Sequence, residues 1–289
     1  MKIIASLAAL VLASASFAQT PQTRPEDNVA RPVEAVHAED MPANPGLPTL
    51  WIVGDSTARN KEDLGWGDHF AHYVDTSRLN VVNRARAGRS SRTFIKEGAW
   101  DKVVERLKPG DMVLIQMGHN DGGEVEAQPK SRGTLKGVGD ETKTLNWPDG
   151  SVEVVHTYGW YLRKYISDTR SKGMMPIILA PVPHSPRQPV ERGDVEKSPY
   201  VGWAEEVAKA EKAPFVHLNK LILARYAGMA PADVRAKYFT PADGTHTNSA
   251  GARLNAACVA EGLRALKDCR LKDHLLPSAT EAGRKPDGD

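Results

Sequence analysis

Residues 50–56 read LWIVGDS, a run of four apolar residues followed directly by a glycine and two polar residues. An apolar run of this length is typical of a strand that is buried on both faces, as in a parallel sheet. Similar runs recur at residues 79–82, 112–117, 176–180 and 215–218. The sequence therefore predicts five buried strands, and the first of them ends just before Asp55 and Ser56.

Amphipathic segments alternate with these predicted strands. Apolar residues recur at helical spacing in residues 66–74, 99–107, 158–169, 204–212 and 250–266. Alternation of strands and helices through a whole domain predicts a doubly wound α/β fold. Residues 122–156 are the exception because they show no clear period, and a connection of that length is usually functional or disordered.

The two ends of the chain differ in composition from this central part. Residues 1–18 have a basic start, an apolar run and small residues before a cleavage position near Ala18, which is the pattern of a secretory signal peptide. We therefore expect a secreted or periplasmic protein. Residues 19–47 are rich in proline and acidic residues and predict a disordered linker. Residues 48–269 hold the predicted domain, and residues 270–289 predict a polar tail.

The composition excludes several classes of function. Lys and Arg number 38 against 36 Asp and Glu, and a net charge of +2 is too balanced to predict a nucleic-acid partner. No segment after the signal peptide is long and apolar enough to cross a membrane. The histidines lie on separate segments without the spacing of metal ligands, so we expect no metal. Cys258 and Cys269 are the two cysteines, and whether they form a disulfide is left open by the sequence.

Three polar motifs follow the first three predicted strands. Ser56 follows the first strand, Gly88 lies shortly after the second, and Asn120 follows the third. Doubly wound sheets bind ligands beyond the carboxyl ends of their strands, at the point where the strand order reverses. With a strand order of 2-1-3, Ser56 lies between the other two residues. The peptide N–H of Gly88 and the side-chain amide of Asn120 can then stabilise an oxyanion formed at an ester carbonyl.

A serine nucleophile needs a base, and the motif DGTH at residues 243–246 offers one. His246 can accept a proton near neutral pH, and Asp243 can hold its imidazole in the required tautomer. Each residue also has an ordinary structural explanation: Ser56 as a helix cap, Gly88 as a turn glycine and His246 as a surface side chain. Their joint occurrence in this order favours a catalytic triad of Ser56, His246 and Asp243.

Together these motifs resemble the SGNH (GDSL-type) hydrolase family, whose four sequence blocks carry a serine, a glycine, an asparagine and a histidine. The matching blocks are GDS at 54–56, Gly88, GHND at 118–121 and DGTH at 243–246. Three further segments resemble the rhamnogalacturonan acetylesterase branch of that family: GWGDHF from Gly65, NRARAGRSSRTF from Asn83 and RGTLKGVGDET from Arg132.

The resemblance implies a flavodoxin-like three-layer α/β/α sandwich with a five-stranded parallel sheet. It implies an oxyanion hole made by Ser56, Gly88 and Asn120, and hydrolysis without a cofactor. The implied activity is removal of acetyl groups from plant cell-wall polysaccharide, with rhamnogalacturonan as the first expectation. The expected partner is thus an acetylated polysaccharide or oligosaccharide, and we expect the protein to be a monomer.

Two kinds of side chain are candidates for binding such a substrate. Four arginines lie around Gly88, and Arg89 and Arg92 are the candidates for binding carboxylates, because the guanidinium group matches a carboxylate in shape. Trp147 lies within residues 122–156 and is the aromatic candidate for stacking on a sugar.

Other functions stay open at this point. The same motifs suit a xylan or general carbohydrate acetylesterase, or a lipase- or thioesterase-like hydrolase of acyl esters, because fold alone does not decide the substrate. A long acyl chain needs an apolar groove, whereas residues 122–156 are polar and charged. A glycan-binding module without catalytic activity is the remaining alternative, and the retention of Ser56, Asp243 and His246 argues against it.

Overall fold

The computed structural model describes residues 41–61, 63–126 and 130–277 of the chain. The predicted signal peptide of residues 1–18 and most of the predicted linker lie outside these residues, as does the end of the chain from residue 278. The strands and helices described below all belong to the part that begins at residue 41.

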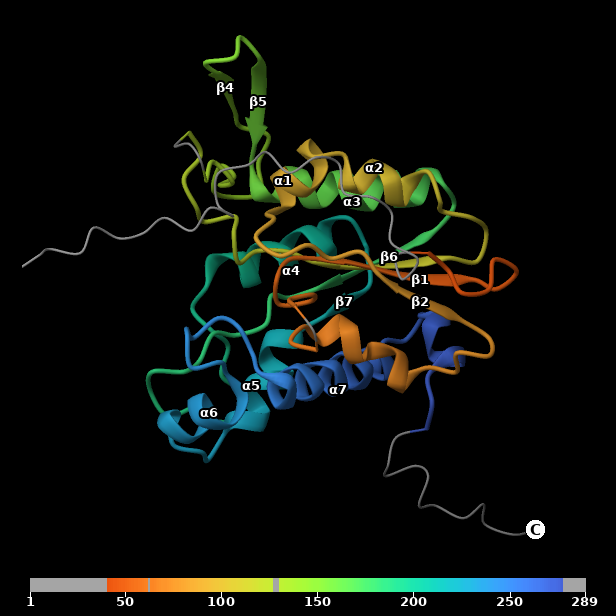
Figure 1. Ribbon diagram of the computed structural model, residues 1–289, viewed down its shortest axis with the longest axis vertical. Coiled ribbons are helices and arrows are strands. Elements are labelled where there is room, and N and C mark those ends of the chain that lie inside the picture. Colours follow the sequence, from red (N-terminus) through yellow and green to blue (C-terminus); the bar gives the residue numbers. More distant parts are fainter. Residues whose placement is uncertain (1–40, 62, 127–129, 278–289) are drawn as a thin grey trace, which may run out of the picture. The chain divides into compact units, whose positions relative to one another are not determined.

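Five parallel strands form the central sheet, in the order β2-β1-β3-β6-β7 (Figure 1). The strands are β1 (Thr49–Gly54), β2 (Asn80–Asn83), β3 (Met112–Gln116), β6 (Met175–Leu179) and β7 (Phe215–Val216). All five apolar runs are therefore strands, and the order around β1 is the one that brings Ser56 between the ends of β2 and β3. The prediction of a five-stranded parallel sheet is confirmed.

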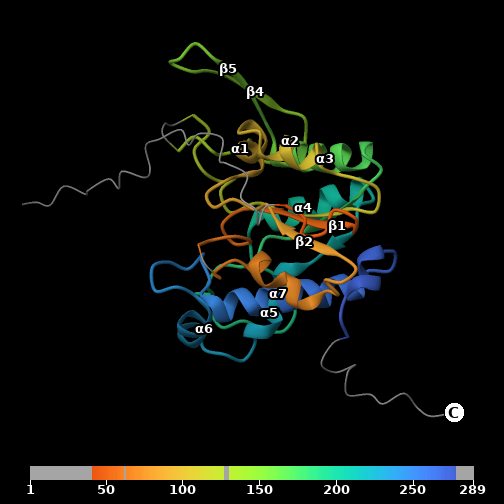
Figure 2. The same cartoon turned by 45° about the vertical axis from the view of Figure 1, so that its right-hand side comes forward.

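Helices cover both faces of this sheet (Figures 1 and 2). One face carries α1 (Ser91–Lys96), α2 (Ala99–Val104), α3 (Tyr158–Ser171) and α4 (Pro199–Ala210). The other face carries the 3₁₀ helix η3 (Trp66–Tyr73) and the helices α5 (Leu218–Tyr226), α6 (Pro231–Tyr238) and α7 (Ser249–Ala265). The three-layer α/β/α sandwich is therefore confirmed, although α1, α5 and α6 were not predicted from the sequence.

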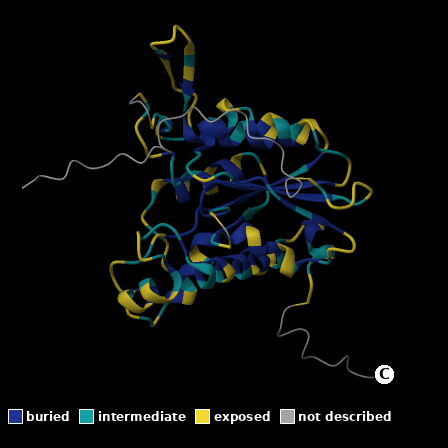
Figure 3. Ribbon diagram, in the orientation of Figure 1, coloured by how far each residue is buried: buried dark blue, intermediate teal, exposed yellow. Residues whose placement is uncertain are grey.

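The side chains of β1 show why both faces need a helical layer. Trp51 and Val53 pack with the helices of one layer, and Leu50 and Ile52 pack with those of the other. Successive side chains of a strand point to opposite faces, so an uninterrupted apolar run leaves apolar surface on both sides of a sheet. Figure 3 shows the result, with buried residues concentrated in the sheet and on the helix surfaces that face it.

Residues 122–156 are not merely a long loop. They contain an antiparallel hairpin of β4 (Thr142–Asn146) and β5 (Val152–His156), which projects away from the helices in Figure 1. In the hairpin only Leu145 and Val155 are fully buried, whereas Val152 is 64% exposed. The alternation that normally marks a strand is thus too weak in this segment to be recognised from sequence.

Both predicted domain boundaries need correction. The side-chain amide of Asn80 donates to the carbonyl of Asn44 at 2.8 Å and accepts from its N–H at 2.9 Å, so the end of the predicted linker is bound to the domain. A 3₁₀ helix, η4 (Arg270–His274), follows residue 269, and Leu271 within it is completely buried. Residues 270–275 therefore pack on the domain rather than beginning a polar tail.

Three further findings concern features weighed from the sequence. Cys258, in α7, and Cys269 are both buried free thiols. Within residues 41–61, 63–126 and 130–277, no helix is long and apolar enough to cross a bilayer. The same residues contain no group of three His, Cys, Asp or Glu side chains arranged to hold a metal ion.

Candidate active site

Ser56 lies in a tight turn at the carboxyl end of β1. The N–H groups of Ala58 and Arg59 both donate to the carbonyl of Asp55, at 3.1 and 3.2 Å, and this closes the turn. Gly54 is required just before it, because a Cβ there would lie 2.9 Å from the Cβ of Ala58. The turn leaves Ser56 6% exposed at the edge of the sheet where the strand order reverses.

The structure brings Ser56, His246 and Asp243 together although 190 residues separate the first two. His246 Nε2 lies 2.9 Å from Ser56 Oγ, and His246 Nδ1 lies 2.7 Å from Asp243 Oδ2. The other carboxylate oxygen of Asp243 accepts the N–H groups of Thr245 and His246 at 2.7 and 2.8 Å. Burial opposes ionisation of Asp243, but these hydrogen bonds lower its pKa below the usual range. The carboxylate therefore stays charged while it holds the imidazole with Nε2 directed at Ser56.

Gly88 and Asn120 lie on neighbouring loops beside this turn. Gly88 has φ +78°, in the left-handed region that favours glycine, and its carbonyl accepts Arg132 Nη1 at 3.0 Å. Asn120 Nδ2 donates to the carbonyl of Arg89 at 3.0 Å, which fixes the amide against the Gly88 loop. The loop is tied to β1 in turn, because the N–H of Arg86 donates to the carbonyl of Gly54 at 3.0 Å. The second hydrogen of the Asn120 amide can still serve a ligand.

Asp121 and Arg132 lie in motifs that were matched from the sequence, but neither was predicted to be a residue of the site. The carboxylate of Asp121 accepts the N–H of Ser91 at 3.1 Å and the Ser91 hydroxyl, so it joins the loop after β3 to the start of α1. Burial raises the pKa of Asp121 to about 7, against the hydrogen bonds from Ser91. Arg132 belongs to the segment RGTLKGVGDET, and that motif was the one signal that pointed to it.

The expectation that Arg92 binds substrate is wrong. Its side chain is 0% exposed, and its Nε and Nη2 atoms donate to the two carboxylate oxygens of Glu153 at 2.7 and 2.9 Å. Its Nη1 atom donates to the carbonyls of Val125 and Gly133 at 3.0 and 2.7 Å. Arg92 therefore joins α1 to the β4–β5 hairpin and has no free edge for a ligand.

Arg89 and Trp147, the other two substrate-binding candidates, lie nearer the surface. Arg89 is 21% exposed in its side chain and donates through Nε to Glu97 Oε2 at 2.8 Å. The indole N–H of Trp147 donates to Glu153 at 2.9 Å, and the ammonium group of Lys96 lies 4.7 Å from the ring centroid. Both side chains are thus partly engaged within the protein, and the ammonium group of Lys96 covers one face of the Trp147 ring.

Two grooves border the segments that carry His246 and Ser56. The first, of 990 Å³, runs along residues 183–190 and 194–197 and reaches Gly244 and Thr245, next to His246. The second, of 980 Å³, is lined by Arg59 and Lys61, which lie shortly after Ser56 in sequence. Each of these two grooves borders a segment next to a residue of the site and is large enough to hold part of a ligand.

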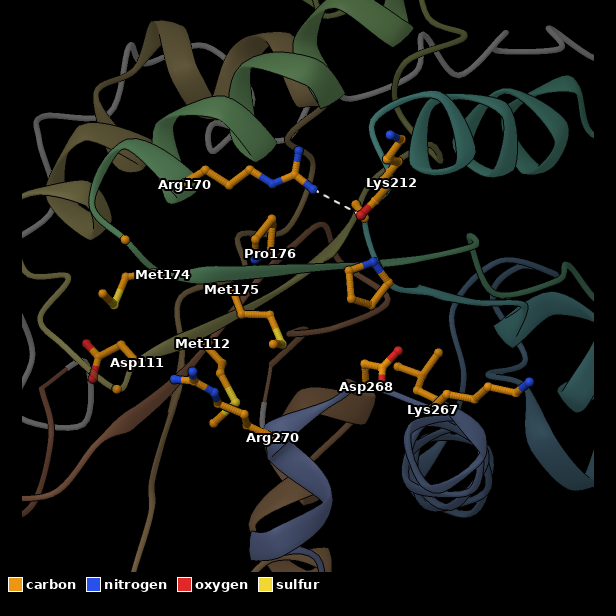
Figure 4. A pocket seen from close by; sticks show the side chains of 15 residues that line it. Asp111, Met112, Arg170, Met174, Met175, Pro176, Lys212, Lys267, Asp268 and Arg270 are labelled. Carbon is orange, nitrogen blue, oxygen red and sulfur yellow. Dashed lines mark hydrogen bonds between the residues drawn. The ribbon is translucent and has the colours of Figure 1, made fainter.

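A further cavity lies at the other edge of the sheet and is shown in Figure 4. It has a volume of 620 Å³ and includes Met112 and Met175, the first residues of β3 and β6. Arg170 closes part of it by donating to the carbonyl of Lys212 at 3.1 Å. Its lining includes no serine, cysteine or histidine, so it offers neither a nucleophile nor a base of the kind found at Ser56.

The sequence of this chain is similar to those of two rhamnogalacturonan acetylesterases. The chain is 31% identical over 210 residues to a rhamnogalacturonan acetylesterase from Emericella nidulans, covering 72% of this chain and 81% of that protein. It is 27% identical over 246 residues to the rhamnogalacturonan acetylesterase RhgT from Bacillus subtilis, covering 78% of this chain and 94% of that protein.

A solved structure and a family model agree with the fold. The crystal structure of protein YxiM from Bacillus subtilis matches with a TM-score of 0.59 at 24% identity, over 75% of this chain and 56% of that one. The family model matches residues 52–254, which include every residue of the site described above. The chain therefore belongs to the GDSL-like lipase/acylhydrolase family.

Proposed function

We propose that the protein is a serine esterase that removes acetyl groups from plant cell-wall polysaccharide, and rhamnogalacturonan is the substrate we favour. One observation carries the proposal: Ser56 Oγ, His246 and Asp243 form a continuous hydrogen-bonded chain with distances of 2.9 and 2.7 Å. A serine activated by a histidine that a carboxylate orients is the arrangement that acyl transfer requires.

In the reaction, Ser56 Oγ attacks the carbonyl carbon of the acetyl ester while His246 Nε2 accepts the hydroxyl proton. Asp243 stabilises the imidazolium that forms and does not itself take the proton. His246 then donates that proton to the sugar oxygen as the ester bond breaks, which leaves an acetyl group on Ser56. A water molecule then attacks this acyl-enzyme while the same imidazole takes its proton. The imidazole returns that proton to Ser56 Oγ as the acyl bond breaks and acetate leaves.

The negative charge on the carbonyl oxygen needs hydrogen-bond donors that are already in position. We assign this role to the peptide N–H groups of Ser56 and Gly88 and to the side-chain amide of Asn120. The contacts of Gly88 with Arg132 and of Asn120 with Arg89 support the assignment, because they restrict both donors before a substrate arrives.

The choice of substrate is supported by the names of the relatives and by the charge of the groove beside His246. Two relatives are rhamnogalacturonan acetylesterases, and such a polymer carries uronic-acid carboxylates. The groove that reaches Gly244 is lined by three basic residues, Arg187, Lys197 and Arg235, and by two acidic residues, Asp194 and Glu196. Glu196 is already engaged by His184 at 2.7 Å. We therefore propose that the carboxylates of the polymer bind to basic residues of this groove and not to Arg92. The partly exposed Arg89 is a second proposed contact.

We also propose that the protein acts outside the cytoplasm, on the basis of the signal-peptide pattern in residues 1–18. Expression of the full chain in a host that exports proteins, followed by sequencing of the amino terminus, tests this. The mature protein should begin near Gln19. A purified protein that keeps its first residues and stays in the cytoplasm would contradict export.

Acetate release is the direct test of the activity. The wild-type protein should release acetate from acetylated rhamnogalacturonan faster than from acetylated xylan or homogalacturonan, and should hydrolyse p-nitrophenyl acetate faster than the octanoate. Ser56→Ala should lower kcat by at least about 10³-fold, because only the oxyanion hole and binding then remain. Ser77→Ala, which changes an exposed serine in a turn, should leave kcat unchanged.

The outcomes separate the alternatives. Faster hydrolysis of the octanoate would favour a lipase- or thioesterase-like enzyme, and equal rates on xylan and rhamnogalacturonan would leave a general carbohydrate acetylesterase. A Ser56→Ala variant that keeps about a tenth of the wild-type kcat would exclude Ser56 as the nucleophile.

Recognition of uronates can be tested separately. Arg187→Ala and Lys197→Ala should raise KM for the acidic polymer and leave KM for p-nitrophenyl acetate unchanged. Raising the salt concentration should have the same effect, because screening shortens to about 8 Å at physiological ionic strength. Lys220→Ala, which removes an exposed lysine outside this groove, is the matched control. Unchanged KM values in both groove variants would show that the groove does not bind carboxylates.

A further inference from the structure

A second histidine–carboxylate pair is formed by the residues that immediately precede Ser56 and Asn120 in sequence. Asp55 precedes Ser56 at the end of β1, and His119 precedes Asn120 just beyond β3. Asp55 Oδ2 lies 3.1 Å from His119 Nδ1, and the two side chains are 0% and 3% exposed. The reaction described above uses neither group.

The hydrogen bonds of this pair favour one protonation state of His119. His119 Nε2 lies 2.9 Å from the carbonyl oxygen of Val182, which can only accept. Asp55 accepts the N–H of Thr57 at 2.9 Å and the N–H of His119 at 3.4 Å, and both contacts favour the ionised carboxylate. The Thr57 hydroxyl lies 2.8 Å from Asp55 Oδ1 and 3.0 Å from Gln116 Oε1. A neutral imidazole has a single N–H and would leave one of its two ring contacts without a hydrogen. Both contacts are satisfied only when His119 is an imidazolium.

Electrostatics agrees with this geometry. Burial by itself raises the pKa of Asp55 and lowers that of His119, but the attraction between the two groups and their hydrogen bonds together outweigh it. The pKa of Asp55 is therefore below its usual value and that of His119 above it. A buried pair of this kind is costly to break from one side, because the remaining charge loses its partner.

Other ionisable groups surround the pair from each neighbouring element. In the segment after β6, the ring of His184 lies 5.3 Å from that of His119, and Glu196 accepts from His184 Nδ1 at 2.7 Å. Asp121 interacts with Asp55 and His119 from beyond β3. On α3 and α4, Tyr158 and Tyr200 are kept neutral because burial raises the pKa of both. The pKa of Glu196 is below its usual value, and its negative charge favours the positive charge on His119.

We propose that His119 is a positioning residue for the esterase reaction: as an imidazolium bridging Asp55 and the carbonyl of Val182, it holds the Ser56 turn and the Asn120 turn in register. This inference rests on the proposed function. The two turns come from different strands, and the nucleophile and the oxyanion donor must act on one carbonyl group. A shift of about 1 Å between such groups can cost about 10²-fold in rate, although the chemistry of each group is unchanged.

Kinetics test the positioning role. His119→Gln keeps a polar amide but no charge, and we expect it to lower kcat for p-nitrophenyl acetate by about 10- to 100-fold with KM within about two-fold. The matched control is His69→Gln, which alters another buried histidine, paired with Asp63 at 2.7 Å and outside both turns; it should keep the wild-type kcat. A folded His119→Gln protein whose kcat stays within about two-fold of wild type would overturn the proposal.

The double variant adds a second kinetic test. If Asp55 and His119 act as one unit, Asp55→Asn combined with His119→Gln should lower kcat by much less than the product of the two single effects. Multiplicative effects would show that the two residues act independently, and would contradict the pair as the positioning device.

Nitrogen NMR of the histidine rings in the wild-type protein tests the protonation state without a variant and without activity. At about pH 7.5, where an ordinary histidine is neutral, both ring nitrogens of His119 should carry protons. As the pH is raised further, kcat should fall over the range in which one of these protons is lost. A single protonated nitrogen at about pH 7.5, or loss of the proton with kcat unchanged, would overturn the proposal. If the protein hydrolyses no ester at all, the proposed function fails, and the NMR result still decides the state of the pair.

Discussion

The Glu153→Gln substitution removes the negative charge that faces the buried guanidinium of Arg92. In the folded protein Glu153, on β5, accepts Arg92 Nε and Nη2 at 2.7 and 2.9 Å, Lys96 Nζ at 2.5 Å and Trp147 Nε1 at 2.9 Å. Because the Arg92 side chain is 0% exposed, its charge cannot be solvated when Glu153 becomes neutral. The substitution should therefore destabilise the whole protein through the contact between α1 and the hairpin.

The size of the effect follows from the pKa of the carboxyl group. Burial opposes ionisation of Glu153, but the hydrogen bonds from Arg92 and Lys96 lower its pKa from 4.5 to about 2. That difference corresponds to about 3 kcal/mol of folding free energy, at about 1.4 kcal/mol for each pKa unit. Lys96 is 45% exposed and its share is screened by solvent. We therefore expect Glu153→Gln to lower the free energy of unfolding by about 2–3 kcal/mol at neutral pH.

The pH dependence of this difference has a definite sign. The folded-state pKa of Glu153 is below its unfolded value, so the stabilisation is fully present above about pH 4.5 and is lost as the pH falls toward about 2. The difference between wild type and Glu153→Gln should thus shrink by about half between pH 7 and pH 3.

Urea unfolding followed by circular dichroism at both pH values measures the two differences. Glu141→Gln, which neutralises an exposed glutamate of the same segment, is the control and should change the free energy of unfolding by less than about 0.5 kcal/mol. A Glu153→Gln difference below about 0.5 kcal/mol at pH 7, or one of equal size at pH 3, would refute the reasoning.

Three further predictions concern the site and the thiols. Asn120→Ala should lower kcat for p-nitrophenyl acetate by about 10²–10³-fold with little change in KM, and an effect on KM alone would mean that Asn120 only positions substrate. In the wild type, kcat/KM for a non-ionising ester should fall in acid solution, because an imidazole that already carries a proton on Nε2 cannot accept the serine proton. A flat profile between about pH 4 and 8 would exclude a histidine base. Cys258 and Cys269 are buried, and burial raises the pKa of Cys258 to about 11, so both should react with a thiol reagent only after the protein is unfolded. If fewer than two thiols react after unfolding without a reductant, the two cysteines are not both free thiols.

The sequence by itself was sufficient to predict the five-stranded sheet and to select the serine, histidine and aspartate that the structure brings together. The five strands could be predicted because each is an uninterrupted apolar run, and such runs report burial on both faces regardless of what covers them. Ser56, Gly88, Asn120 and His246 could be selected because each chemical role needs a particular residue type directly after a strand or in a tight turn. The apolar runs and the short polar motifs each span only a few consecutive residues, so both can be recognised without knowledge of the tertiary structure.

The tertiary structure decided everything that depends on pairing between distant segments. Arg92 and Glu153 are 61 residues apart, so no local pattern shows that this arginine is buried in an ion pair rather than exposed beside Gly88. Asp55 and His119 are 64 residues apart and each has an ordinary local explanation, as a turn residue and as a surface histidine. Only the packing of distant segments brings these groups to hydrogen-bond distance. Because the pairs are buried, removing one partner would leave the other charge without water or a counter-charge. The hairpin was missed for a related reason, since the part of it that packs on the domain is too small to impose a period on its sequence.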